Sequence, residues 1–201
     1  MAYPYPNPSP TLNLPFANPV SIIDPHFCAP NPVDLVIIRK VLTITDGNFV
    51  VTDVNGNILF KVKEKFLSLH GRRVLLDGAG NPIVTLKLKV VVVTGLVLDA
   101  MDACASLKLK IDVFLANNTK EEVCDFTVKQ SWLGRSCVIY AGESSTIVAQ
   151  MHNKDTVEST LIGKDKFKVT VYPNIDYAFI VALFMILDAI EYTGGGGGGG
   201  E

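Results

Sequence analysis

The stretch Tyr177-Ala-Phe-Ile-Val-Ala-Leu-Phe-Met-Ile-Leu187 is apolar without a break and lies between Asp176 and Asp188. Three turns of α-helix carry side chains in every direction, so a helix without a polar position has no face to offer to water. Spanning a membrane takes about 20 apolar residues, and this stretch has 11. We therefore predict a helix within residues 174–192 that is buried on all sides inside the protein.

The residues before this helix show the pattern of an antiparallel sheet, in which short β-branched and aromatic runs alternate with Asn, Asp and Gly turns. In the clearest hairpin, residues 49–53 and 58–62 flank Asn55-Gly56, which predicts a type I′ turn. A second hairpin joins residues 73–76 to 83–88. The other predicted strands are 36–42, 90–98, 107–115, 124–129, 136–140, 147–152, 157–162 and 166–172. We expect about twelve strands in all.

The buried helix limits how these strands can be arranged. A helix with its side chains is about 10–12 Å across, and an eight-stranded barrel has room only for its own side chains, whereas an eleven-stranded can admits a central helix. A β-sandwich, the alternative, leaves the helix without a cavity. The expected fold is mainly β (α+β): an antiparallel barrel of about twelve strands that encloses the hydrophobic C-terminal helix.

Length and composition fit one domain with two tails. The 201 residues divide into a Pro-rich tail at 1–19, a domain at 20–193 and a Gly-rich tail at 194–201. We expect Ile22, Ile23 and Phe27 to anchor the segment after the Pro-rich tail to the domain. The net charge of −2 predicts no attraction of the whole molecule to nucleic acid. Without a targeting signal we expect a cytoplasmic location, with the plasma-membrane surface and the nucleus as alternatives.

Several motifs together resemble a known family. They are Thr45-Asp-Gly-Asn-Phe-Val-Val-Thr-Asp-Val-Asn-Gly-Asn, His70-Gly-Arg-Arg-Val-Leu-Leu-Asp-Gly-Ala-Gly-Asn-Pro, Trp132-Leu-Gly-Arg-Ser-Cys and Val169-Thr-Val-Tyr-Pro-Asn-Ile-Asp-Tyr. Over residues 20–191 the chain closely resembles the plant LURP-one-related proteins, whose fold is similar to the tubby C-terminal domain and to phospholipid scramblases. The resemblance implies a twelve-stranded barrel around a central helix, a relation to membrane-tethered regulators and a context in plant defence.

One segment departs from the family pattern. Residues 89–106 lack the tryptophan-bearing strand of such proteins and are shorter by about a hairpin. A mis-spliced and a degenerate segment are both compatible with this difference. Fewer strands would put closure of the barrel in doubt.

No catalytic constellation is present in the sequence. There is no G-x-S-x-G, phosphate-binding Gly loop or H-E-x-x-H, and we expect Asp53-Val-Asn-Gly-Asn57 and Asp77-Gly-Ala-Gly80 to be turns. Cys137 is expected to be a buried thiol. We therefore predict a protein that is not an enzyme and that uses no metal or other cofactor.

Basic residues recur with a period of two, which places each set on one side of its strand. If these rows are neighbours, they form a basic face that can bind a phosphoinositide headgroup; the alternative is an ordinary solvated exterior. Tubby-like domains are known for such binding, so the resemblance favours it. We expect Arg72 and Arg73 to lie in a loop near these rows. The candidate headgroup residues are Lys61, Lys63, Lys65, Arg72, Arg73, Lys87, Lys89, Lys164, Lys166 and Lys168.

The sequence thus predicts a binding or tethering module whose partner is an anionic, phosphoinositide-bearing membrane. A further expected partner is a protein that recognises the Pro-rich tail. Two alternatives stay open: a scramblase-like protein in which residues 177–187 insert into a bilayer, and a purely structural protein-interaction adaptor.

Overall fold

The computed structural model describes residues 16–39, 49–65, 72–87, 108–131, 136–152 and 166–194. Its elements are the short 3-10 helix η1 (Pro25–Phe27), strands β1 (Val33–Arg39), β2 (Phe49–Thr52), β3 (Ile58–Lys65), β4 (Arg72–Asp77), β5 (Pro82–Lys87), β6 (Lys108–Val113), β7 (Phe126–Ser131), β8 (Ser136–Ala141), β9 (Ile147–His152) and β10 (Lys166–Val171), and helix α1 (Tyr177–Gly194).

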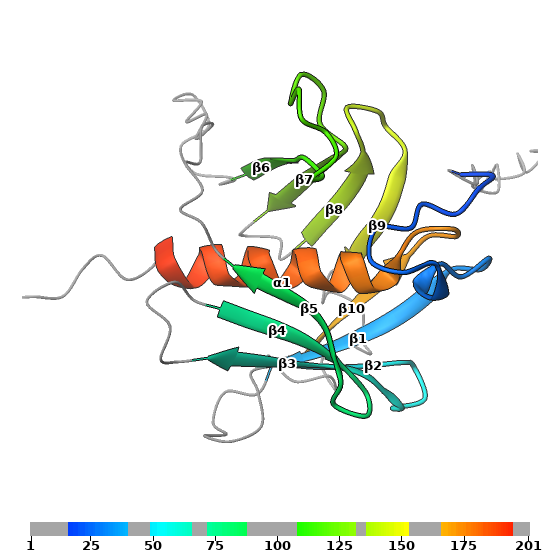
Figure 1. The fold of residues 1–201 in the computed structure, drawn as a ribbon, viewed down its shortest axis with the longest axis vertical. Coiled ribbons are helices and arrows are strands. Elements are labelled where there is room, and N and C mark those ends of the chain that lie inside the picture. Colours follow the sequence, from blue (N-terminus) through cyan, green and yellow to red (C-terminus); the bar gives the residue numbers. More distant parts are fainter. Residues whose placement is uncertain are drawn as a thin grey trace, which may run out of the picture.

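The ten strands form one antiparallel sheet in the order β5-β4-β3-β2-β1-β10-β9-β8-β7-β6. Strands β1 and β10 join its two halves, with Val33 opposite Val171 and Ile38 opposite Lys166. The sheet bends around helix α1, so that β6 to β9 lie on one side of the helix and β1 to β5 on the other (Figure 1). The first and last parts of the chain therefore build the centre of the sheet together.

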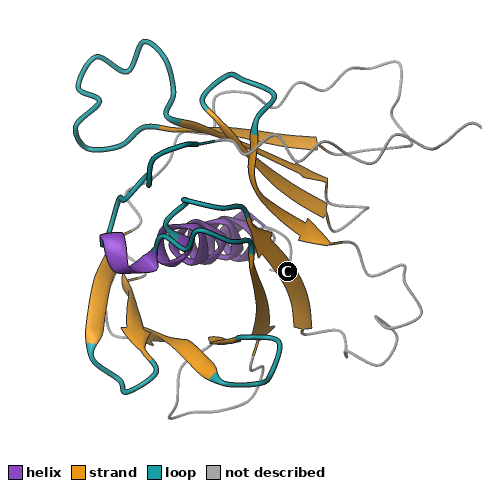
Figure 2. Ribbon diagram, turned by 90° about the vertical axis from the view of Figure 1, so that its right-hand side faces the viewer, coloured by secondary structure: helices purple, strands orange, loops and turns teal. Residues whose placement is uncertain are grey.

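Helix α1 is buried by this sheet, as its sequence predicts (Figure 2). Every residue from Ala178 to Met185 is buried. Rings from both halves of the sheet contact the helix: Phe126 of β7 lies 5.2 Å from Phe179, and Phe60 of β3 lies 5.8 Å from Tyr177, between ring centroids. The apolar stretch is thus the centre of the core, and the prediction of an all-round buried helix is confirmed.

The closed twelve-stranded barrel is not what the described residues form. Their sheet has ten strands, and its end strands, β5 and β6, do not pair with each other. Two predicted strands, at 90–98 and 157–162, lie outside the described residues. A mainly β fold with one enclosed helix is confirmed, whereas closure of the barrel is wrong for this part of the chain.

The β2–β3 turn also differs from its prediction. Gly56 has φ +86°, but no positive φ occurs at Asn55, so the loop is not a type I′ turn. The amide of Gly56 donates to the carbonyl of Asp53, and the amide of Asp53 donates to the carbonyl of Asn57. This is a three-residue connection in which only glycine takes the left-handed conformation. The Asp53 carboxylate supports it by accepting from the amides of Asn55 and Asn57, at 2.9 and 2.8 Å.

The segment 16–29, which we call the N-terminal segment, packs at the start of helix α1. Ile22, Ile23 and Phe27 contact the core, as predicted. The buried carboxylate of Asp176 accepts from the amide of Phe179 at 3.0 Å and so caps the helix. Its second oxygen accepts from the amides of residues 22, 23 and 24, at 3.1, 2.6 and 3.1 Å.

Candidate functional site

The predicted basic residues fall into three groups. Lys61, Lys63, Lys65, Arg72, Arg73 and Lys87 lie on the neighbouring strands β3, β4 and β5; Lys166 and Lys168 lie on β10; Lys89 and Lys164 lie outside the described residues. Strands β1 and β2 separate the first group from the second.

Strand register brings Lys65, Arg72 and Lys87 together. Lys65 is paired with Arg72, and Arg72 with Lys87, so the three residues form one row across three adjacent strands. Neighbouring strands are about 4.7–4.9 Å apart, which makes the row about 10 Å wide. Strand alternation places Lys61 and Lys63 on the same face as this row, which is opposite to the buried Val62. We call this face of β3 to β5 the outer face.

Arg73 does not belong to this outer face. The sequence analysis places Arg72 and Arg73 in a loop, but both lie in β4, where alternation turns one residue outward and the next inward. Arg73 is 5% exposed, and its Nη1 donates to the carbonyl of Met185 at 2.6 Å and to the Asp188 carboxylate at 3.0 Å. Arg73 therefore holds the helix within the sheet, and its side chain is buried instead of lying on the outer face with the other headgroup candidates.

Two of the remaining lysines have partners within the protein. Lys61 donates to the carbonyl of Gly78 at 2.9 Å. Lys168 forms an ion pair with Asp34 at 3.0 Å. Burial alone would raise the pKa of Asp34, but hydrogen bonds from Thr170 and Lys168 outweigh it and lower that pKa. Lys63 and Lys166 are exposed. The outer face thus offers Lys63 and the row Lys65–Arg72–Lys87 as its main basic positions.

The basic residues also gather at one end of the molecule. At the end of the sheet near the C-terminus of helix α1, six of the ten strands begin or end with a basic residue: Arg39, Lys65, Arg72, Lys87, Lys108 and Lys166. We call these six residues the basic end. Acidic residues described at the same end are Glu64 in β3 and Asp188 and Glu191 in the helix. Because a helix C-terminus carries partial negative charge, this arrangement also stabilises helix α1.

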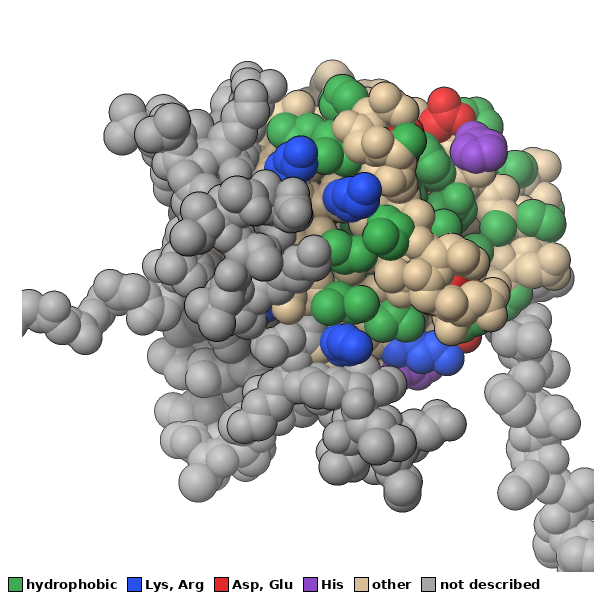
Figure 3. Space-filling view, turned by 90° about the horizontal axis from the view of Figure 1, so that it is seen from below, with side chains coloured by type: hydrophobic (Ala, Val, Ile, Leu, Met, Phe, Trp, Pro, Cys, Tyr) green, Lys and Arg blue, Asp and Glu red, His purple; other side chains and the backbone are tan. Residues whose placement is uncertain are grey.

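The opposite end, where helix α1 begins, has the opposite charge. None of the ten strands begins or ends there with a basic residue. Its described turns and loops, with the strand ends beside them, carry one lysine, Lys120. The same regions carry seven acidic residues that are at least partly exposed, in addition to the buried Asp176: Asp24, Asp53, Asp77, Glu121, Glu122, Asp125 and Glu143. We call these seven residues the acidic end. In Figure 3, Asp and Glu side chains appear toward the right, the side on which α1 begins in Figure 1, and Lys and Arg side chains lie mostly nearer the middle among hydrophobic ones.

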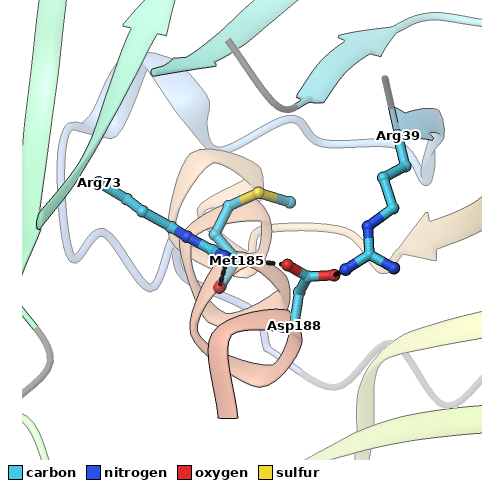
Figure 4. A network of polar contacts seen from close by, with 4 residues as sticks. All are labelled: Arg39, Arg73, Met185 and Asp188. Atoms are coloured by element: carbon cyan, nitrogen blue, oxygen red, sulfur yellow. Dashed lines mark hydrogen bonds and ion pairs between the residues drawn. The ribbon is translucent and has the colours of Figure 1, made fainter. Parts of the chain in front are cut away.

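A network of charged groups at the basic end joins Arg73 to Asp188 and Arg39, two residues that are not among the predicted site residues. Asp188 binds Arg73 through Oδ2, at 3.0 Å, and Arg39 through Oδ1, at 2.5 Å (Figure 4). Both guanidinium groups lie over the ring of Phe49, at 5.7 and 5.8 Å from its centroid. The only signal in the sequence is that the apolar stretch ends at an aspartate, which gives no indication of its two partners.

No helix among the described residues is both long and apolar enough to cross a membrane.

Comparisons with known proteins agree with this architecture. The family model described as LURP-one-related matches residues 33–188. Two Arabidopsis thaliana relatives are Protein LURP-one-related 15, 55% identical over 85% of each chain, and Protein LURP1, 46% identical over 88% of this chain and 92% of the relative. An X-ray structure of a protein from Arabidopsis thaliana matches with a TM-score of 0.61 and 46% identity, covering 85% of this chain and 98% of that one. The chain therefore belongs to the LURP-one-related family.

Proposed function

We propose that this protein is a non-enzymatic docking module that binds phosphorylated lipid headgroups of an anionic membrane through the outer face of β3 to β5 at the basic end. The observation that carries the proposal is the register of Lys65, Arg72 and Lys87, which aligns three basic residues without an acidic residue between them. The acidic residues of these strands, Glu64 and Asp77, belong to other rows, because they are paired with the buried Arg73 and Phe60. The row is therefore made of basic residues alone.

The strength of such docking follows from the number of basic residues. Each Lys or Arg near an anionic surface contributes about 1 kcal/mol, so Lys63 and the row together supply about 4 kcal/mol. That corresponds to a dissociation constant of about 1 mM, which is weak. A headgroup with several phosphates concentrates negative charge within the row, and we therefore favour phosphoinositides over singly charged lipids.

The competing bilayer-inserting function has less support. It requires residues 177–187 to leave the protein and enter a membrane, yet their side chains form the centre of the core. Moving them would also break the contacts of Asp176 and Asp188 at the two ends of this stretch. Docking through the exterior leaves these contacts intact.

Vesicle flotation tests the proposal. Phosphatidylcholine vesicles with about 5% phosphatidylinositol bisphosphate should recover the protein at about 0.15 M salt, and recovery should fall at about 0.5 M salt because salt screens exposed charges. Exchanging Lys65, Arg72 and Lys87 for glutamine should lower affinity by about 3 kcal/mol, roughly 100-fold. The control exchanges Lys120, Lys129 and Lys168 for glutamine, which changes the net charge equally but leaves the outer face of β3 to β5 intact. Equal recovery with and without the phosphoinositide would refute the proposal.

A further inference from the structure

The ion pairs at Asp188 contain more positive than negative charge. One carboxylate binds two guanidinium groups, and the two arginines differ in their surroundings. The Arg73 side chain is 6% exposed and also donates to the carbonyl of Met185, whereas the Arg39 side chain is 42% exposed. Asp188 keeps a buried cationic partner if Arg39 moves away. Arg39 is therefore the partner that can be exchanged.

Arg39 is also well placed to contact a ligand at the basic end. It is the last residue of β1, and its neighbour Ile38 is paired with Lys166 of β10. Its guanidinium lies over the ring of Phe49, which begins β2. Contact with an aromatic face restrains an arginine without neutralising its charge, so the guanidinium stays near the end of the sheet while its ionic partner changes.

We propose that Arg39 is a further headgroup-binding residue, and that a lipid phosphate replaces Asp188 as its ionic partner. Because the Arg39–Asp188 ion pair must break first, Asp188 limits the affinity of the basic end for the membrane. The inference rests on the proposed docking function and names the residue pair that regulates it. The exchange is feasible because ion pairs with a substantially exposed partner are weak, whereas a phosphate offers Arg two parallel hydrogen bonds.

A double-mutant cycle distinguishes this exchange from simple charge addition. In the native protein, Arg39→Gln should weaken binding to phosphatidylinositol bisphosphate vesicles about threefold. The effect is small because Arg39 must give up its ion pair with Asp188 when it binds the phosphate, which offsets part of the binding free energy. In the Asp188→Asn background the same change should weaken binding about tenfold, because Arg39 is then free to bind the phosphate. The matched control is Lys166→Gln, which should weaken binding equally in both backgrounds.

Each outcome decides between the hypotheses. If the native protein binds the vesicles but Arg39→Gln has equal effects in the two backgrounds, competition between Asp188 and the lipid phosphate for Arg39 is refuted and the docking function stands. If neither the native protein nor Asp188→Asn binds, both fail. If Asp188→Asn loses its cooperative thermal transition, the guanidinium NMR resonance of Arg39 in the native protein decides instead. It should shift saturably as a short-chain phosphatidylinositol bisphosphate is added, and an unchanged resonance with bound lipid overturns the inference.

Discussion

Asp176 connects the start of helix α1 to the N-terminal segment through one buried carboxylate. Four backbone amides donate to it, three from residues 22–24 and one from Phe179. We expect Asp176→Ala to lower the free energy of unfolding by about 3–5 kcal/mol, because buried amides would lose a charged acceptor. Asp24→Ala is the control, since the exposed Asp24 caps only η1 and its loss should cost about 1 kcal/mol. Urea unfolding measures both; a loss below about 1 kcal/mol for Asp176→Ala would contradict the assignment.

For single residues, the sequence predicts the buried position of the helix but not the partners of the charged residues at its ends. Asp176 and Asp188 were recognised as the limits of an apolar stretch, which sufficed to predict a buried helix rather than a membrane span. Their partners could not be predicted, because Arg39, Arg73 and the amides of residues 22–24 are more than 100 positions away in the chain. Arg73 was misplaced for a local reason: which of two adjacent arginines faces inward depends on where the strand begins.

At the level of elements, the β2–β3 and β4–β5 turns have the same construction. In each, an aspartate accepts from backbone amides and from the side chain of an asparagine four residues later, Asp53 from Asn57 and Asp77 from Asn81. Hydrogen bonding to the Asn57 side chain is the main reason why the pKa of Asp53 is lowered. We expect Asn57→Ala to raise the pKa of Asp53 toward about 3.9, its ordinary value.

Carboxyl-carbon NMR titration measures this shift, and Asp77 serves as the internal control because its own partner, Asn81, is unchanged. The sign of the stability effect follows from linkage. Because the folded pKa of Asp53 is below its unfolded value, its stabilising effect is present above about pH 3.9 and is lost as the pH falls through the folded pKa. An Asp53 pKa that does not move in Asn57→Ala would show that the asparagine is not its cause.

The elements themselves were largely predictable, because strand alternation and Gly-containing turns are local signals. The predicted strands at 58–62, 83–88 and 166–172 correspond to β3, β5 and β10 within a few residues. Turn type is less predictable, because Asn55-Gly56 is compatible with two loop geometries. The hydrogen bonds between Asp53 and Asn57, which enclose a three-residue loop, select one of them. Closure of the sheet depends on pairing between strands far apart in the chain, which local patterns do not determine.

Over the whole molecule, charge is separated along the axis of helix α1. The period-two lysines of β3 were visible in the sequence, but the basic end was not, because it depends on which strand termini meet. An 18-residue helix is about 27 Å long, so the acidic end lies several Debye lengths from the basic end. A molecule with this charge distribution should dock on an anionic surface in one orientation, with its basic end toward the lipid and its N-terminal segment away from it.

Quenching of tryptophan fluorescence by brominated lipids tests this orientation. Trp132, the single tryptophan, is exchanged for phenylalanine, and one new tryptophan is introduced at either of two positions. Thr85 is exposed and lies two residues before Lys87 on β5. Val54 is 61% exposed and lies in the β2–β3 turn at the acidic end. On phosphoinositide vesicles, Thr85→Trp should be quenched and Val54→Trp should not, provided that both variants bind as the native protein does. Equal quenching at the two positions would mean that the protein lies on its side or docks in several orientations, so that separated charge would not determine how it meets the membrane.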